Sequence, residues 1–104
     1  MIEAVREGLR EEMERDSSVF LIGQDIGVNG GVFRVTEGLQ AEFGIDRVID
    51  APLAESGLVG VAIGAALNGM RPVVEIQFAD FIFPAFNQLV SEAEIRRASC
   101  RERV

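Results

Sequence analysis

Few side chains of this 104-residue chain can carry chemistry, and most of those are carboxylates. The sequence contains no His, no Lys, no Trp and no Tyr, and its one Cys is Cys100. Without His the commonest general base and transition-metal ligand is missing, and without Lys there is neither Schiff-base chemistry nor a P-loop cation. A single Cys excludes an internal disulfide framework and a zinc ribbon. Any catalysis must depend on carboxylates, amides, backbone groups or a cofactor, and no metal site is predicted.

Glu55 has the most unusual surroundings of the carboxylates. The fifteen residues that follow it, Ser56 to Met70, contain no charge. We therefore expect the Glu55 carboxyl to face an apolar, poorly hydrated place, where burial favours the protonated acid. For an isolated glutamate the commoner interpretation is an acid at a helix N-terminus, stabilised by the helix dipole.

Alternating strands and helices must position these groups. The predicted strands are 19–22, 47–50 and 72–78, and the predicted helices are 2–15, 36–43, 56–70 and 80–93. This order predicts an α/β fold, a parallel sheet with flanking helices. A glycine-rich loop, 23–31, follows the first strand, and ligands bind at such loops in open α/β sheets. Because three short strands leave half of their faces without a partner, we expect an incomplete fold, the first part of a larger sheet.

Charge and hydropathy exclude several classes of partner. The net charge of −7 is opposite to that of a nucleic-acid footprint or a polybasic membrane anchor. The acidic, amphipathic N-terminus does not resemble a signal or transit peptide. The longest uncharged run is too short and too rich in glycine for a membrane span. We expect a cytoplasmic protein with no nucleic-acid or membrane partner.

The C-terminal residues differ in composition from all that precede them. Residues 94–104 contain four of the ten basic residues of the chain. They resemble the translated read-through of a sequencing adapter, which favours a natural domain portion at 1–93 and a non-native tail at 94–104. In that interpretation Cys100 has no function. The alternative is a basic helix end that complements the helix dipole.

Three motifs in register carry a family resemblance. They are GGVFRVTEGL (30–39), PLAESGLVG (52–60) and RPVVEIQFADFIFPAFNQ (71–88). Together they resemble the β subunit of the thiamine diphosphate-dependent decarboxylating component of 2-oxo acid dehydrogenase complexes, over residues 1–93. The stretch 75–88 is more similar to the branched-chain members than to the pyruvate members. The resemblance implies a transketolase-like architecture, of which this chain would form the first part of the pyrimidine-binding domain.

The same resemblance implies an activity and partners. The activity is oxidative decarboxylation of a branched-chain 2-oxo acid, with acyl transfer to a lipoyl domain of an acyltransferase core. The implied partner is an α subunit, in an α2β2 heterotetramer, that supplies the diphosphate and Mg²⁺ site. One alternative is a β subunit for pyruvate or acetoin. Another is a truncated, non-catalytic fragment.

The resemblance also assigns roles to particular residues. Glu55 matches the glutamate that shares a proton with the aminopyrimidine of the cofactor, so that the cofactor serves as its own base. Phe81 would stack near the pyrimidine, and Leu53 would line its pocket. Gln24 stands where the family usually has a glutamate that takes part in proton exchange between active sites. Because an amide cannot titrate, the relay is either rerouted, for example through Asp25, or absent.

The remaining aromatic and glycine residues of these motifs are predicted to pack. The aromatic residues expected in the core or at a subunit interface are Phe78, Phe83 and Phe86. The glycines expected on one side of their helix, in close contact with a partner subunit, are Gly57, Gly60 and Gly64. Their spacing does not match a dinucleotide fingerprint, which needs two glycines one residue apart after a strand.

Overall fold

A three-stranded parallel sheet lies at the centre of the chain, of which this computed structural model describes residues 1–94. The strands are β1 (Val19–Gln24), β2 (Val48–Ala51) and β3 (Arg71–Glu75). The helices are α1 (Ile2–Arg15), α2 (Leu39–Phe43) and α3 (Glu55–Leu67), followed by the 3-10 helix η1 (Ala79–Ala85) and the π-helix η2 (Gln88–Glu94). Apart from Glu94, the expected non-native tail, 94–104, lies outside the described residues.

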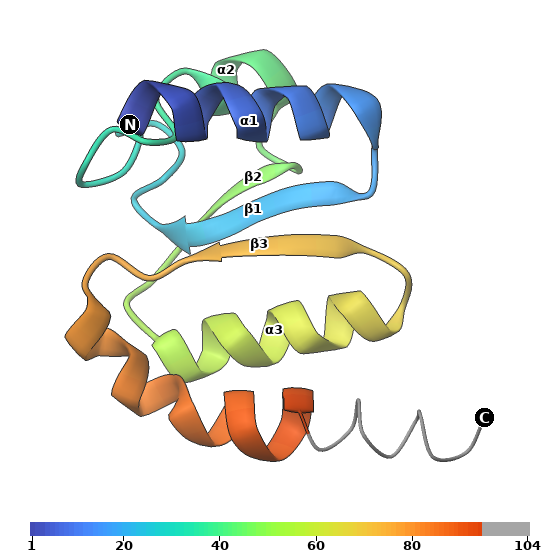
Figure 1. Cartoon of the computed structure of the whole chain (residues 1–104), viewed down its shortest axis with the longest axis vertical. Helices are drawn as coiled ribbons and strands as arrows, with labels where there is room; N and C mark the ends of the chain where they lie inside the picture. The colour runs from blue at the N-terminus through green and yellow to red at the C-terminus, as the bar shows by residue number, and fades with distance from the viewer. Residues whose placement is uncertain (95–104) are drawn as a thin grey trace.

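The strand order is β2-β1-β3, and both pairs are parallel. The central strand, β1, begins with four consecutive apolar residues, 19–22. Such a run is typical of a strand that is covered on both faces. Figure 1 shows α1 and α2 on one side of the sheet, and α3 with the η1 and η2 segment on the other. The predicted α/β fold with a parallel sheet and flanking helices is confirmed.

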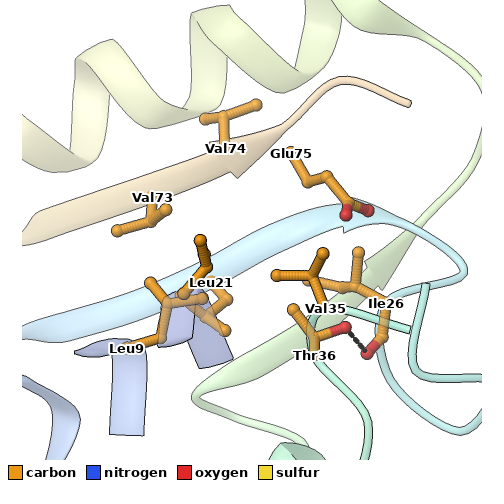
Figure 2. Close-up of a pocket in the computed structure, with 9 residues that line it drawn as sticks. Leu9, Leu21, Ile26, Val35, Thr36, Val73, Val74 and Glu75 are labelled. Atoms are coloured by element: carbon orange, nitrogen blue, oxygen red, sulfur yellow. Dashed lines mark hydrogen bonds between the residues drawn. The ribbon is translucent and has the colours of Figure 1, made fainter. Parts of the chain in front are cut away.

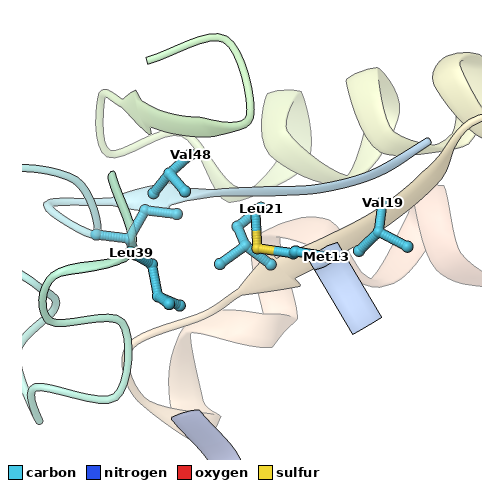
Figure 3. Packing of buried hydrophobic residues seen from close by; sticks show 6 residues of the cluster. Met13, Val19, Leu21, Leu39 and Val48 are labelled. Carbon is cyan, nitrogen blue, oxygen red and sulfur yellow. The ribbon is translucent and has the colours of Figure 1, made fainter. Parts of the chain in front are cut away.

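Successive residues of β1 point to opposite faces of the sheet and build two cores. On one face Val19 and Leu21 belong to a buried cluster that α1, α2 and β2 complete (Figure 3). The members of this cluster are Met13, Val19, Leu21, Ile26, Leu39 and Val48. On the other face Phe20 and Ile22 pack against Leu58 of α3. This period of two decides on which face each later residue of β1 lies.

The last predicted helix, 80–93, differs most from expectation. The chain forms η1 and η2 there instead of one α-helix. Pro84 lies inside η1. Because proline lacks an N–H and its ring clashes with the preceding turn, a regular α-helix does not continue through this position. The prediction of one regular helix was therefore wrong, although the segment is helical in a broader sense.

Several predicted boundaries shift by a few residues. Strand β3 ends at Glu75, three residues before the predicted end, and α3 starts at Glu55 itself. Helix α2 is shorter than predicted because Gly38, its N-cap, has a left-handed φ of 82°. The predicted stop at Gly44 is confirmed: its φ is 94°, a conformation that side-chain-bearing residues rarely adopt.

One guanidinium joins the end of α1 to the start of β1. Arg47 Nη2 donates to the carbonyl oxygens of Met13 at 2.8 Å, Asp16 at 2.9 Å and Val19 at 2.8 Å. Its Nε also donates to Val19 at 3.2 Å, and the guanidinium lies 5.2 Å from the centre of the Phe43 ring. Arg47 therefore satisfies backbone oxygens that the end of α1 leaves without helical partners.

We expect Arg47→Ala to lower the free energy of unfolding by about 2–3 kcal/mol, because several part-buried carbonyl oxygens lose a charged donor. Arg47→Lys should lose less of the free energy of unfolding than Arg47→Ala but should remain below the wild type, since an ammonium lacks the planar fork of donors. Urea unfolding followed by circular dichroism measures the change. The control is Arg15→Lys, at an exposed arginine paired with Glu12. Equal midpoints for Arg47→Ala and the control would contradict the assignment.

Candidate active site

Glu55 is the first residue of α3 and is half-buried. It therefore lies in the first turn, where unpaired backbone N–H groups and the helix dipole favour a negative charge. An apolar pocket of about 230 Å³ begins beside it. The lining residues are Ala51, Pro52, Ala54, Gly57, Leu58 and Val61. The expectation of apolar surroundings and the commoner helix-start interpretation are thus both consistent with where Glu55 lies.

Gln24 is the last residue of β1. It therefore lies at the carboxyl end of the sheet, which is also the end at which α3 begins after β2. In the register it pairs with Ala51, which lines the apolar pocket. Since Ile22 faces α3, the alternation of β1 puts Gln24 on the α3 face as well. The structure therefore brings Gln24, the pocket and the first turn of α3 to one end of the sheet.

Phe81 and Leu53 lie on the two segments that flank this region. Phe81 belongs to η1, which contacts α3, and its side chain is partly open at 37% exposure. Figure 1 shows the orange η1 segment beside the N-terminal end of α3. Leu53 lies in the link between β2 and α3 and is exposed. Both side chains are thus open to a ligand at the end of the sheet where α3 begins. Their predicted contacts with a cofactor stay predictions.

Three aromatic residues that were expected in a core or an interface are exposed. Phe78, Phe83 and Phe86 belong to neither buried cluster of the described chain. The reason is that η1 follows the end of β3 and packs on α3 rather than on the sheet. The core interpretation was wrong for these residues, and the interface interpretation stays a prediction.

The loop between β1 and α2 packs closely on its neighbours. Gly27 N donates to Asp50 Oδ1 at 2.6 Å, and a Cβ at Gly27 would lie only 2.4 Å from Asp50 Oδ2. Within the same loop Thr36 Oγ1 donates to the carbonyl of Ile26 at 2.7 Å. Asp25, a suggested proton carrier, is exposed and has a left-handed φ of 57°. The loop is thus a built structure with fixed contacts to β2.

Glu75 is the carboxylate that sequence reasoning missed. Its Oε2 is buried and has no hydrogen-bond partner within the described residues. Figure 2 shows the side chain at the end of β3, beside a pocket of about 180 Å³ that Ile26, Val35 and Thr36 help to line. Gly31 gives it room, because a Cβ there would lie 3.4 Å from Glu75 Oε1. Burial raises the pKa of Glu75 above its ordinary value.

The position of Glu75 could have been found from the period of its strand. Val73 lines the same pocket as Glu75, two residues before it, which is the spacing of one strand face. A carboxylate at an inward position of an apolar strand is a signal of perturbed titration. In the register Glu75 pairs with Gly23, whose side of β1 faces away from α3. Glu75 and Glu55 therefore belong to opposite faces of the sheet.

Two further observations concern the described residues as a whole. Among residues 1–94, no cluster of three or more His, Cys, Asp or Glu residues could hold a metal ion. No helix in that part of the chain is both long and apolar enough to span a membrane.

The chain has relatives among known proteins. The chain matches the family described as transketolase, pyrimidine binding domain, over residues 1–102, and it belongs to that family. It is 60% identical over 92 residues to the 2-oxoisovalerate dehydrogenase subunit beta of Bacillus subtilis (strain 168), covering 88% of this chain and 28% of that protein. The expected family resemblance is confirmed.

Relatives named as 2-oxoisovalerate dehydrogenase subunits and as pyruvate dehydrogenase subunits have nearly the same sequence identity to this chain. A pyruvate dehydrogenase E1 component subunit beta of Leifsonia xyli subsp. xyli is 56% identical over 92 residues, covering 88% of this chain and 27% of that protein. A 2-oxoisovalerate dehydrogenase subunit beta of Pseudomonas aeruginosa is 56% identical over 93 residues, covering 89% and 27%. The chain spans less than a third of the length of these relatives.

We expect Glu75→Gln to remove a pH dependence of stability. A carboxyl whose folded pKa is raised binds its proton more tightly in the folded chain. Its contribution to stability is therefore present below the ordinary pKa of about 4.5 and is lost as the pH rises through the folded pKa. Relative to the wild type, Glu75→Gln should therefore gain stability as the pH rises from that ordinary value toward neutrality.

The measurement is urea unfolding at several pH values in that interval. Glu11→Gln, at an exposed position of α1, serves as the control. If the two variants show the same pH dependence relative to the wild type, the burial of the Glu75 carboxyl does not influence its titration.

Proposed function

We propose that this chain supplies the cofactor-activating part of the β subunit of a thiamine diphosphate-dependent 2-oxo acid dehydrogenase. The observation that carries the proposal is the position of Glu55, half-buried in the first turn of α3 beside an apolar pocket. Membership of the transketolase pyrimidine-binding family and 60% identity to a 2-oxoisovalerate dehydrogenase subunit beta support it.

The residues around Glu55 fit an aminopyrimidine ring. The pocket of about 230 Å³ has an apolar lining suited to a flat heterocycle, and Glu55 lies in the chain between Ala54 and Gly57, which line it. In this assignment Glu55 holds a proton against a ring nitrogen, Phe81 stacks on the ring, and Leu53 covers its edge. The bound cofactor supplies a thiazolium carbon that becomes a nucleophile toward the 2-oxo acid. Glu55 is the residue of this chain that we assign as catalytic.

A branched-chain 2-oxo acid is the substrate that we favour. The stretch 75–88 has the character of the branched-chain members, and the relative at 60% identity carries that name. A pyruvate dehydrogenase subunit at 56% identity makes pyruvate the second candidate. A non-catalytic fragment is the alternative of another class. Sequencing the source locus past the codon for Ala93 tests it, because continuation into a β subunit favours the enzyme.

The proposed partners are an α subunit, in an α2β2 heterotetramer, and a lipoyl acyltransferase core. The α subunit would supply the diphosphate and Mg²⁺ site. Open surfaces on α3 and η1 support a partner here: Val61 and Phe83 are exposed, and a Cβ at Gly64 would meet nothing within 4 Å in the described chain. Apolar surface of this kind on a helix and its neighbour is typical of an interface.

Gln24 defines how this site differs from the family pattern. Its side chain belongs to the α3 face, like the pocket, but an amide donates and accepts hydrogen bonds without exchanging a net proton. Gln77 Nε2 donates to the Gln24 carbonyl at 3.3 Å and links the ends of β1 and β3. We propose that Gln24 orients groups at this edge and that the site acts without a titrating group at this position.

The test is Glu55→Gln in the full-length β subunit assembled with its α partner. Glutamine keeps the shape and a hydrogen bond but has no acidic proton, so assembly and most of the cofactor affinity should be retained. Proton removal from the thiazolium carbon should slow by roughly a hundredfold to ten-thousandfold. Quenched-flow NMR of hydrogen–deuterium exchange at that carbon measures it. If the variant exchanges at the wild-type rate, the catalytic assignment of Glu55 is wrong and the residue has only a structural role at the start of α3.

A further inference from the structure

Three phenylalanine rings from separate segments form a continuous chain of edge-to-face contacts. Phe33 lies in the loop after β1, Phe78 follows the end of β3, and Phe81 lies in η1. The ring centres of Phe33 and Phe78 are 5.7 Å apart at an interplanar angle of 77°, and those of Phe78 and Phe81 are 5.5 Å apart at 83°. Both pairs have the separation and angle at which the positive edge of one ring meets the negative face of another.

These rings are not a buried core. Phe33 is 50% exposed, Phe78 45% and Phe81 37%. Each ring therefore makes a defined contact with its neighbour while much of its surface stays open. An isolated phenylalanine on a short, exposed helix would exchange between rotamers, whereas a perpendicular neighbour restricts the rotation of its ring.

The backbone next to the first ring of the chain is held by the loop and by α1. The next residue, Arg34, has a left-handed φ of 61°, which is uncommon for a residue with a side chain. Its Nη1 donates to the Asn29 carbonyl at 2.6 Å, and its own carbonyl accepts a hydrogen bond from the Arg6 guanidinium. Contacts therefore run from α1 through the loop to Phe33, and from there through Phe78 to Phe81.

We propose that Phe33 and Phe78 are positioning residues that set the orientation of the Phe81 ring toward the aminopyrimidine. The inference rests on the proposed function, in which Phe81 contacts the cofactor. A ring already held in its binding orientation loses less conformational freedom when a ligand stacks on it, and affinity rises accordingly. Through Phe33 the glycine-rich loop takes part in cofactor binding without touching the cofactor.

The test compares leucine variants in the full-length β subunit assembled with its α partner. Phe78→Leu should weaken thiamine diphosphate binding, measured by isothermal titration calorimetry, by roughly three- to tenfold, and Phe33→Leu by less. Phe78→Tyr keeps the ring and should restore affinity. The control is Ile45→Leu, in the link between α2 and β2, because Ile45 is 73% exposed and is in neither ring pair. Thermal melting and sedimentation establish that each variant folds and assembles.

A double-mutant cycle separates positioning from general packing. If Phe78 acts through Phe81, Phe78→Leu should cause no further loss of affinity in a Phe81→Leu background. Additive losses would overturn the inference, as would a Phe78→Leu variant that binds like the Ile45→Leu control while Phe81→Leu binds weakly. If Phe81→Leu itself binds the cofactor like the wild type, the proposed contact with Phe81 fails, and the positioning role fails with it.

Discussion

The order of the whole structure depends on how Arg47 ends one helix and starts the central strand. Its guanidinium binds carbonyl oxygens of Met13, Asp16 and Val19 and lies over the Phe43 ring. These contacts fix the turn between α1 and β1, which determines where β1 begins. Because β1 is the central strand and pairs with both neighbours, a slip of one residue there would exchange the two faces of the sheet. Arg47 therefore holds the start of the strand whose alternation puts Gln24 on the α3 face.

The alternation of the strands then separates two carboxylates with different environments. Glu55 is half-buried in the first turn of α3 and follows Ala54 of the apolar pocket. Glu75 lies on the opposite face with one oxygen buried and without a hydrogen-bond partner in the described residues, and burial raises its pKa. The Glu75 position therefore favours a neutral acid. The sheet keeps the two carboxyl groups on opposite faces.

Sequence reasoning succeeded where one local signal decides the outcome. The strand predicted at 19–22 lies within β1, and the helix predicted at 36–43 ends where α2 ends, because apolar burial and the glycine at position 44 are local signals. It failed where contacts between distant segments decide. The edge-to-face contact of Phe33 with Phe78 joins residues from two loops. The regular helix predicted at 80–93 was wrong for a local reason instead, because Pro84 lies inside η1. The burial of Glu75 depends on the loop around Gly31 and on the pocket at the end of β3, which bring residues distant in the sequence together.

Gln24, at a position where the resemblance implies a glutamate, has a defined setting in the structure. It ends β1 on the α3 face, paired with Ala51 of the apolar pocket, and its backbone carbonyl accepts a hydrogen bond from Gln77. A carboxylate at this position would put a negative charge next to an apolar pocket, where an unpaired charge is costly. An amide keeps the hydrogen-bonding capacity of the position without adding that charge.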